Sequence, residues 1–256
     1  MLLATYALWR RDIVRFLRQR SRVLGALGTP LVFWVLLGSG LGSSFNVGTG
    51  GASTGGYLEY FYPGSLALIL LFTAIFSTIS VIEDRHEGFL QGVMVAPIPR
   101  LAIVLGKLLG GTTLALLQAA LFLLLAPLAD THIDLATLPL LLFVLAVFAF
   151  ALTGLGFVLA WMLDSTQGFH AIMNLLLFPM WLLSGAVFPP AGASDWIRGA
   201  MLVNPMTYGV AALRTVLASS ESSAELAPVT GALSLLGIFA LLTFALSSWS
   251  VHSRRT

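Results

Sequence analysis

Six long apolar stretches constrain the fold of this sequence more than any other feature. A helix needs about 20 apolar residues to cross the roughly 30 Å hydrocarbon core of a bilayer. The stretches cover about residues 23–45, 61–82, 101–128, 136–163, 168–188 and 228–251. Because they are continuous rather than alternating, they predict helices and not barrel strands. We expect an all-α membrane protein with six transmembrane helices, in a single transmembrane domain over residues 1–256.

The composition excludes a soluble or disordered chain. Only 9% of the 256 residues are charged and 58% are hydrophobic, whereas soluble domains carry about 25% charged residues. Disorder needs low hydrophobicity and high charge, which is the opposite balance. The chain has no cysteine, which excludes disulfides, zinc–thiolate sites and thiol nucleophiles.

Basic residues gather on one side of this topology. Two of the 13 Lys and Arg residues, Arg198 and Arg214, fall between the fifth and sixth spans. The other eleven are Arg10, Arg11, Arg15, Arg18, Arg20, Arg22, Arg85, Arg100, Lys107, Arg254 and Arg255. Because Lys and Arg accumulate on the cytoplasmic side, we expect both termini in the cytoplasm. The chain would be a multi-pass protein of the cytoplasmic (inner) membrane.

Residues 1–22 have a helical pattern of their own. Arg11, Arg15 and Arg18 recur at helical spacing, and Trp9 belongs to an apolar set on the other side. This pattern predicts an amphipathic elbow helix on the inner membrane surface, with its arginines toward water or lipid phosphates. Two roles fit such a helix: a topology anchor, or an elbow that also contacts a cytoplasmic partner.

Motifs for catalysis or nucleotide binding are missing. Gly106-Lys107 is followed by Leu108 and lacks the upstream glycine of a phosphate-binding loop. The H-E-x-x-H and G-x-S-G motifs are also missing. We therefore expect no catalytic residue, no metal site and no cofactor in this chain.

Ionisable residues are expected at the edges of the spans. The dense run at residues 83–87 is interpreted as a solvated helix face rather than a metal site. Lys107 should lie within a turn or two of the cytoplasmic end of its span. The span interiors then hold no deep Asp, Glu, Arg or His, which argues against a proton-driven carrier.

Residues 83–100 form the connection between the second and third spans. A short amphipathic helix up to about Ala96 would present Phe89, Leu90, Val93 and Met94 as its apolar face. Prolines at positions 97 and 99 would then end it. A rigid helix between two spans can carry a push from a soluble partner into the bilayer.

Several motifs, taken in their order and spacing, resemble the membrane subunit of type 2 ABC exporters over nearly the whole chain. The matching segments are Tyr60–Gly64, Glu87–Gln91, Val95–Arg100, Gly106–Lys107, Leu183–Pro189 and Asn204–Tyr208 with Arg214. They are similar to the start of the second span, the cytoplasmic coupling segment, the start of the third span, the end of the fifth, and an outer segment. One departure is Leu90-Gln91, where the family usually has Leu-Glu.

The resemblance implies a permease subunit that is not an enzyme. It would pair with a second copy of itself or a sister permease, above two copies of a separate ABC ATP-binding subunit that binds ATP and Mg. Membrane lipids are expected partners and nucleic acid is not. Contact with the ATP-binding subunit would involve the coupling residues Glu83, Asp84, Arg85, Glu87, Gly88, Phe89, Leu90 and Pro97.

The resemblance also implies an outer gate and a substrate path. Short re-entrant outer helices would lie within residues 189–227, with the gate at Asn204, Pro205 and Tyr208. The path would run between the second and fifth spans. Its candidate residues are Phe72, Phe76, Asn174, Phe178 and Trp181. For the aromatic residues, ordinary packing between spans is the alternative reading.

Two other functions compete with an ATP-driven permease. A multi-span membrane enzyme, such as a protease or lipid transferase, would need a catalytic constellation that the sequence does not offer. A scaffold that transports nothing would not explain a proline-ended helix between two spans.

Overall fold

The computed structural model describes residues 1–41, 57–131, 133–217 and 229–253. Within these ranges the regular structure is helical. The α-helices are α1 (Leu2–Arg18), α2 (Arg20–Leu41), α3 (Tyr57–His86), α4 (Phe89–Val95), α5 (Arg100–Leu123), α6 (Leu138–Met162), α7 (Thr166–Ile172), α8 (Phe178–Trp181), α9 (Asp195–Val203), α10 (Pro205–Leu217) and α11 (Val229–Ser253).

The described part of the chain has six helices long and apolar enough to cross a membrane, which confirms the predicted fold class. They cover Arg20–Gly40, Tyr57–His86, Arg100–Leu123, Leu138–Met162, Thr166–Ala186 and Thr230–Ser253. The second of these helices begins before residue 61 and ends after residue 82, the bounds predicted for that span. Residues 83–86, expected in the connection, form the last turn of this span.

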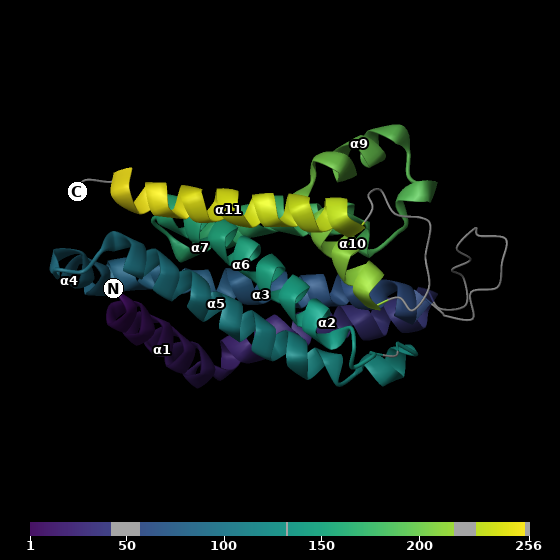
Figure 1. Cartoon of the computed structure of the whole chain (residues 1–256), viewed down its shortest axis with the longest axis horizontal. Coiled ribbons are helices and arrows are strands. Elements are labelled where there is room, and N and C mark those ends of the chain that lie inside the picture. The colour runs from purple at the N-terminus through teal and green to yellow at the C-terminus, as the bar shows by residue number, and fades with distance from the viewer. Residues whose placement is uncertain (42–56, 132, 218–228, 254–256) are drawn as a thin grey trace.

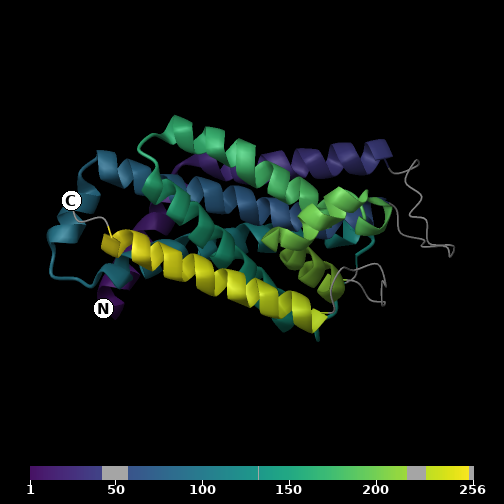
Figure 2. The same ribbon diagram turned by 90° about the horizontal axis from the view of Figure 1, so that it is seen from above.

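The long membrane-spanning helices run roughly along one axis, with α3 at the centre (Figures 1 and 2). In α3, 83% of the most apolar window is buried, compared with 22% in the first span. The start of α1, the whole of α4 and the last turns of α11 share one end of the bundle (Figure 1). We name this end the α4 end, and the opposite end, where α9 and α10 lie, the α10 end.

Small and weakly polar residues bring the spans together. A Cβ added to Gly111 of α5 would lie 2.5 Å from Thr153 Cγ2 on α6, so only glycine fits there. Thr73 Oγ1 on α3 donates a hydrogen bond to Gln118 Oε1 on α5 at 2.9 Å. Close contacts at small residues and hydrogen bonds between mild polar side chains are typical of associated transmembrane helices.

The fifth span departs from a regular helix. Between α7 and α8 lies a π-helical turn at Met173–Leu177, and a second one follows at Leu182–Ala186. Gly185 in the second turn has a φ of 79°, which ends the helix before the predicted bound at residue 188. The span therefore has an irregular end near α10.

Two short helices precede the last span. Asn204 ends α9 and its Oδ1 accepts a hydrogen bond from the Met206 backbone N at 3.1 Å. Pro205 is the first residue of α10, where a missing N–H costs nothing. Tyr208 Oη donates to Leu202 O at 2.6 Å, joining the two helices. Their entry into the membrane stays a prediction, and residues 218–228 lie outside the described ranges.

Candidate coupling site

The chain turns sharply between α3 and α4 at Gly88. This residue has a φ of 75°, in the left-handed region that glycine adopts without strain. Its backbone N donates to Arg85 O at 3.2 Å. As predicted, Leu90 is buried and Phe89, Val93 and Met94 pack partly buried against the core. The turn thus places α4 on the end of the bundle rather than in solvent.

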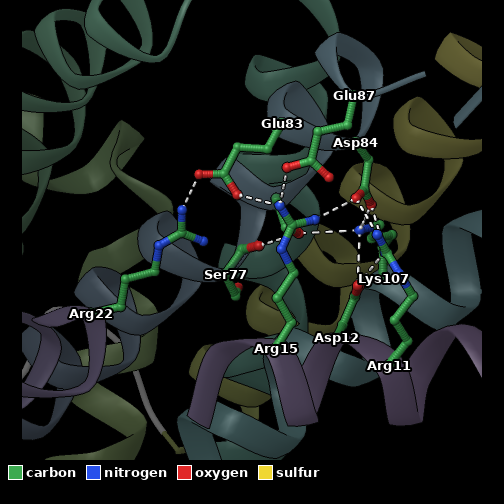
Figure 3. A network of polar contacts seen from close by, with 10 residues as sticks. Arg11, Asp12, Arg15, Arg22, Ser77, Glu83, Asp84, Glu87 and Lys107 are labelled. Carbon is green, nitrogen blue, oxygen red and sulfur yellow. Dashed lines mark hydrogen bonds and ion pairs between the residues drawn. The ribbon is translucent and has the colours of Figure 1, made fainter. Parts of the chain in front are cut away.

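Asp84, in the last turn of α3, is the centre of a group of ion pairs (Figure 3). Its carboxylate accepts from Arg11 Nη1 at 2.9 Å and from Arg11 Nη2, Arg15 Nη1 and Lys107 Nζ at 2.6 Å each. The side chain is 0% exposed. Asp84 is therefore a buried anion that joins α1, α3 and α5.

Lys107 of α5 lies between two carboxylates. Besides Asp84, its Nζ donates to Asp12 Oδ1 at 3.0 Å and to Ser80 Oγ at 3.1 Å. The side chain is only 4% exposed. Lys107 lies about two turns from the start of α5, which is the predicted depth. The interpretation of residues 83–87 as a solvated face is wrong for Asp84, because α1 covers this corner of α3 and α5.

Further ion pairs extend the group toward solvent. Arg15 Nη2 contacts Glu87 at 2.7 Å and Glu83 at 3.2 Å, and Arg22 also pairs with Glu83. The charge cluster consists of Arg11, Asp12, Arg15, Arg22, Glu83, Asp84, Glu87 and Lys107 (Figure 3). Four basic residues balance four acidic ones, so the charges of the buried members Asp12, Asp84 and Lys107 are compensated.

The surroundings shift the titration of the α1 groups. Burial raises the pKa of Asp12, and the nearby Lys107 ammonium opposes this effect. Hydrogen bonding to Asp84 raises the pKa of Arg11. Removing one partner of a buried pair leaves an uncompensated charge, which typically costs about 3–5 kcal/mol. The cluster thus fixes α1 to the α3–α4 corner only while it is complete.

The helix α1 packs closely along α5. A Cβ on Gly106 would lie 2.7 Å from Leu8 Cβ and 3.3 Å from Thr5 O. Trp9 Nε1 donates to Thr113 Oγ1 at 3.0 Å. The close approach lets the short side chain of Asp12 reach Lys107.

Two arginines of α1 depart from the expectation that its basic residues face water or lipid. Arg11 and Arg15 face the acidic residues of α3 rather than water or lipid phosphates, whereas Arg18 is exposed. Leu3 and Tyr6 of the same helix are also exposed. The buried carboxylates determine this orientation, because they require cations and the apolar residues do not.

Several residues expected to touch a partner instead hold α4 in place. Leu90 is buried, and the guanidinium of Arg11 covers the ring of Phe89 at 3.6 Å from the centroid. Arg85 turns toward the end of α6, where it binds Asp164 Oδ1 at 2.9 Å and Trp161 O at 2.8 Å. Leu90 and Phe89 thus attach α4 to the bundle, and Arg85 links α3 to the end of α6.

A different set of side chains forms the accessible surface of α4. Val95 is 86% exposed, and Gln91, Gly92 and Pro97 are also exposed. Glu87 lies at the edge of this surface with a side chain that is 56% exposed. Of the predicted coupling residues, Glu87, Gly88 and Pro97 are therefore the accessible ones.

The predicted path residues separate into two groups. Phe72 and Phe76 pack on each other with ring centroids 6.2 Å apart, and Phe76 also lies 6.3 Å from the His170 ring. Asn174 is exposed on the fifth span. The second group is a packed cluster in which Phe178 and Trp181 both contact Phe33 of α2.

Trp181 has a structural position. It is 1% exposed, and its Nε1 donates to Gly64 O of α3 at 2.8 Å. This burial agrees with the alternative interpretation of Trp181 as ordinary packing between spans.

Sequence reasoning missed four members of this site: Asp12, Arg22, Ser80 and Lys107. One signal was available. Lys107 lies inside Gly106-x-x-x-Gly110, a spacing that permits another helix to cover it. Asp12 is also the single acid among the basic residues of segment 1–22. Together, these features could have suggested a buried Asp12–Lys107 pair.

Comparison with known proteins agrees with this architecture. Residues 4–218 match the family described as ABC-2 type transporter. The chain is 27% identical over 247 residues to nodulation protein J of Sinorhizobium fredii, covering 94% of this chain and 90% of that protein. It is 22% identical over 242 residues to the daunorubicin resistance ABC transporter permease protein DrrB1 of Streptomyces coeruleorubidus. These residues cover 93% of this chain and 83% of that protein.

A third relative is the putative transport permease ycf38 of Cyanophora paradoxa. The identity is 24% over 219 residues, which cover 84% of this chain and 74% of that protein. The family match, the six spans and these permeases agree with one another. The chain belongs to the ABC-2 type transporter membrane family and is a permease subunit of an ABC transporter.

Proposed function

We propose that this permease exports its cargo, driven by two separate ATP-binding subunits that dock on the exposed surface of α4. The observation that carries this proposal is the attachment of α4 to the bundle. The helix presents Val95 outward, while Leu90 is buried against the bundle and Arg11 of the charge cluster covers the Phe89 ring. A push on α4 therefore reaches the central span directly.

The α4 end faces the cytoplasm in this proposal, in the inner membrane. The start of α1 and the end of α11 lie there (Figure 1), so both termini would be cytoplasmic. Nearly all Lys and Arg residues fall in segments at this end, as the positive-inside rule requires. The α10 end would then open outside.

The permease would work as a pair, with a second copy or a sister permease beside it. Only 22% of the apolar window of the first span and 39% of that of the fifth are buried within one chain. Asn174 lies on the exposed side of the fifth span, and a polar amide facing lipid is costly. A partner permease would cover these spans and enclose a path.

The path would run beside Phe72, Phe76, Asn174 and Phe178, on the partly exposed side of α3 and the fifth span. Trp181 would not line this path but would pack against the residues that do. ATP and Mg would bind to the partner subunits, in keeping with the missing phosphate-binding loop of this chain. Export as the direction is supported by the daunorubicin resistance named for the Streptomyces relative.

Replacing Val95 with glutamate should weaken docking of the ATP-binding subunit. The side chain is 86% exposed, so the fold should not change, whereas burying a new carboxylate in an interface costs several kcal/mol. We expect at least about a tenfold loss of copurified ATP-binding subunit and of vanadate-sensitive ATPase, equal to about 1.4 kcal/mol.

The matched control is Leu128→Glu, because Leu128 is 68% exposed but follows α5 at the α10 end. It should leave docking unchanged. Docking of the Val95→Glu variant at the wild-type level would refute α4 as the docking surface.

A further inference from the structure

The end of the fifth span lacks the regular hydrogen bonds of an α-helix. In the turn Leu182–Ala186, Leu183 (φ −87°, ψ 16°) and Gly185 (φ 79°, ψ 5°) leave helical geometry. An irregular backbone frees carbonyl oxygens, which must find protein partners in a membrane protein. Those partners have to come from other helices.

Side chains of α3 and α10 supply these partners. Arg214 Nη2 and Tyr60 Oη each donate to Gly185 O at 2.9 Å. Tyr57 Oη donates to Val187 O at 3.1 Å. The Arg214 guanidinium also stacks over the Tyr60 ring, 4.3 Å from the centroid. One carbonyl thus joins α3, α10 and the fifth span.

Arg214 binds a different kind of acceptor from the arginines of the charge cluster. Arg11 and Arg15 bind carboxylates, whereas the ion pairs found among the described residues do not include Arg214. A hydrogen bond to a neutral carbonyl is weaker than one to a carboxylate. The contact can therefore break and re-form more readily than those at the α4 end.

A second contact would keep the helices together when the first one breaks. Asn204 Nδ2, between α9 and α10, donates to Met180 O at 2.6 Å. This bond lies before the irregular turn and the Arg214 bond lies within it. Release of Arg214 would free the terminal turn of the span while Asn204 still holds its body.

We infer that Arg214 is a positioning residue that holds the exit end of the fifth span closed against α3 and α10, and that it is released when the path opens. The inference rests on the proposed function, in which the α10 end faces outward. The Arg214–Gly185–Tyr60 contact is called the exit latch below.

The absence of native cysteine makes a single-cysteine reporter possible. Ser184 is 2% exposed, next to Gly185, and its Oγ donates to Trp181 O at 2.6 Å. We would place Ser184→Cys in the full chain, assembled with its ATP-binding subunits in membrane vesicles. The rate of labelling by a membrane-impermeant maleimide, added at the outer face, then measures opening of this end.

Arg214→Gln should raise the labelling rate by about tenfold or more, because it removes one closing contact and favours local opening. Tyr60→Phe keeps the ring but removes one donor, and it should give a smaller rise in the same direction. Arg198→Gln is the matched control, since Arg198 is exposed on the neighbouring α9. It should leave the rate unchanged.

Labelling of Arg214→Gln at the rate of the Arg198→Gln control would overturn the exit latch. Should the Arg214→Gln chain fail to assemble, Tyr60→Phe decides in its place. An unchanged rate in that variant would likewise reject the inference.

The effect of nucleotide on labelling distinguishes a contact that is released during opening from one that is merely structural. With the latch intact, a non-hydrolysable ATP analogue should raise labelling, whereas Arg214→Gln should label fast with or without it. If that variant still responded to nucleotide as the unaltered protein does, Arg214 would not be the released contact. Fast labelling of the variant beside an unaltered protein that ignores nucleotide would uphold the latch and refute ATP-driven opening.

Discussion

Replacing Asp84 with asparagine should lower the free energy of unfolding by about 3–5 kcal/mol, the typical cost of breaking a buried ion pair. Asparagine has nearly the same shape, so the change removes charge rather than volume. It leaves Arg11, Arg15 and Lys107 around a neutral group that is 0% exposed. Thermal unfolding in detergent, followed by helical circular dichroism, would measure the loss.

Asp164→Asn is the matched control for Asp84→Asn. Asp164 also pairs with an arginine, Arg85, but its side chain is 81% exposed. Exposed pairs contribute about 0–1 kcal/mol, so this change should be nearly neutral. Equal melting temperatures for both variants would mean that the charge cluster does not hold this end together.

A double substitution tests the same charge cluster by removing a cation and then one of its acidic partners. Lys107→Met alone leaves the two carboxylates of Asp12 and Asp84 without their shared cation. Adding Asp12→Asn removes one of these charges, so the double variant should be more stable than the single one. A strictly additive loss would argue against coupling between Asp12 and Lys107.

Replacing Gly88 with valine should reduce transport, and the ATPase of the ATP-binding subunits that the permease stimulates, by about tenfold or more. The φ of 75° is unfavourable for a β-branched residue, and such strain costs about 1–3 kcal/mol. The chain would relieve it by moving α4 away from the position that α1 and α3 define. ATPase of the assembled complex, measured with cargo uptake into inverted vesicles, reports the effect.

Two other substitutions separate backbone strain from loss of glycine itself. Asparagine tolerates the left-handed region, so Gly88→Asn should keep most of the activity. Gly199 lies in α9, at the opposite end, with open space around its Cβ direction, so Gly199→Ala should be harmless. A Gly88→Val protein as active as these two would show that the turn does not position α4.

The six spans and the all-α class could be predicted because they depend on local hydropathy alone. The short helix after the second span was also readable, since Leu90 and its apolar neighbours have helical spacing and prolines follow them. The C-terminal end of the second span could not be predicted from the sequence. A charged run such as residues 83–86 is typical of a solvated connection. It belongs to a helical turn here because cations of α1 and α5 pair with its carboxylates, which the sequence alone does not show.

The direction of the polar face of α1 was also beyond the sequence. Helical spacing places Arg11 and Arg15 on one side of the helix but does not say what that side contacts. The answer depends on Asp84, more than 60 residues later in the chain. The irregular end of the fifth span was hidden for a similar reason, because Tyr57, Tyr60 and Arg214 satisfy its carbonyls from two other helices.

Photocrosslinking from α4 tests most directly whether an ATP-binding subunit drives this permease. A photoreactive amino acid would replace Val95, and a second protein would carry it at Leu128, in membranes that contain the assembled transporter. We predict a crosslink to the ATP-binding subunit from position 95 and none from position 128. A crosslink from position 128 instead, or none from position 95, would contradict the account.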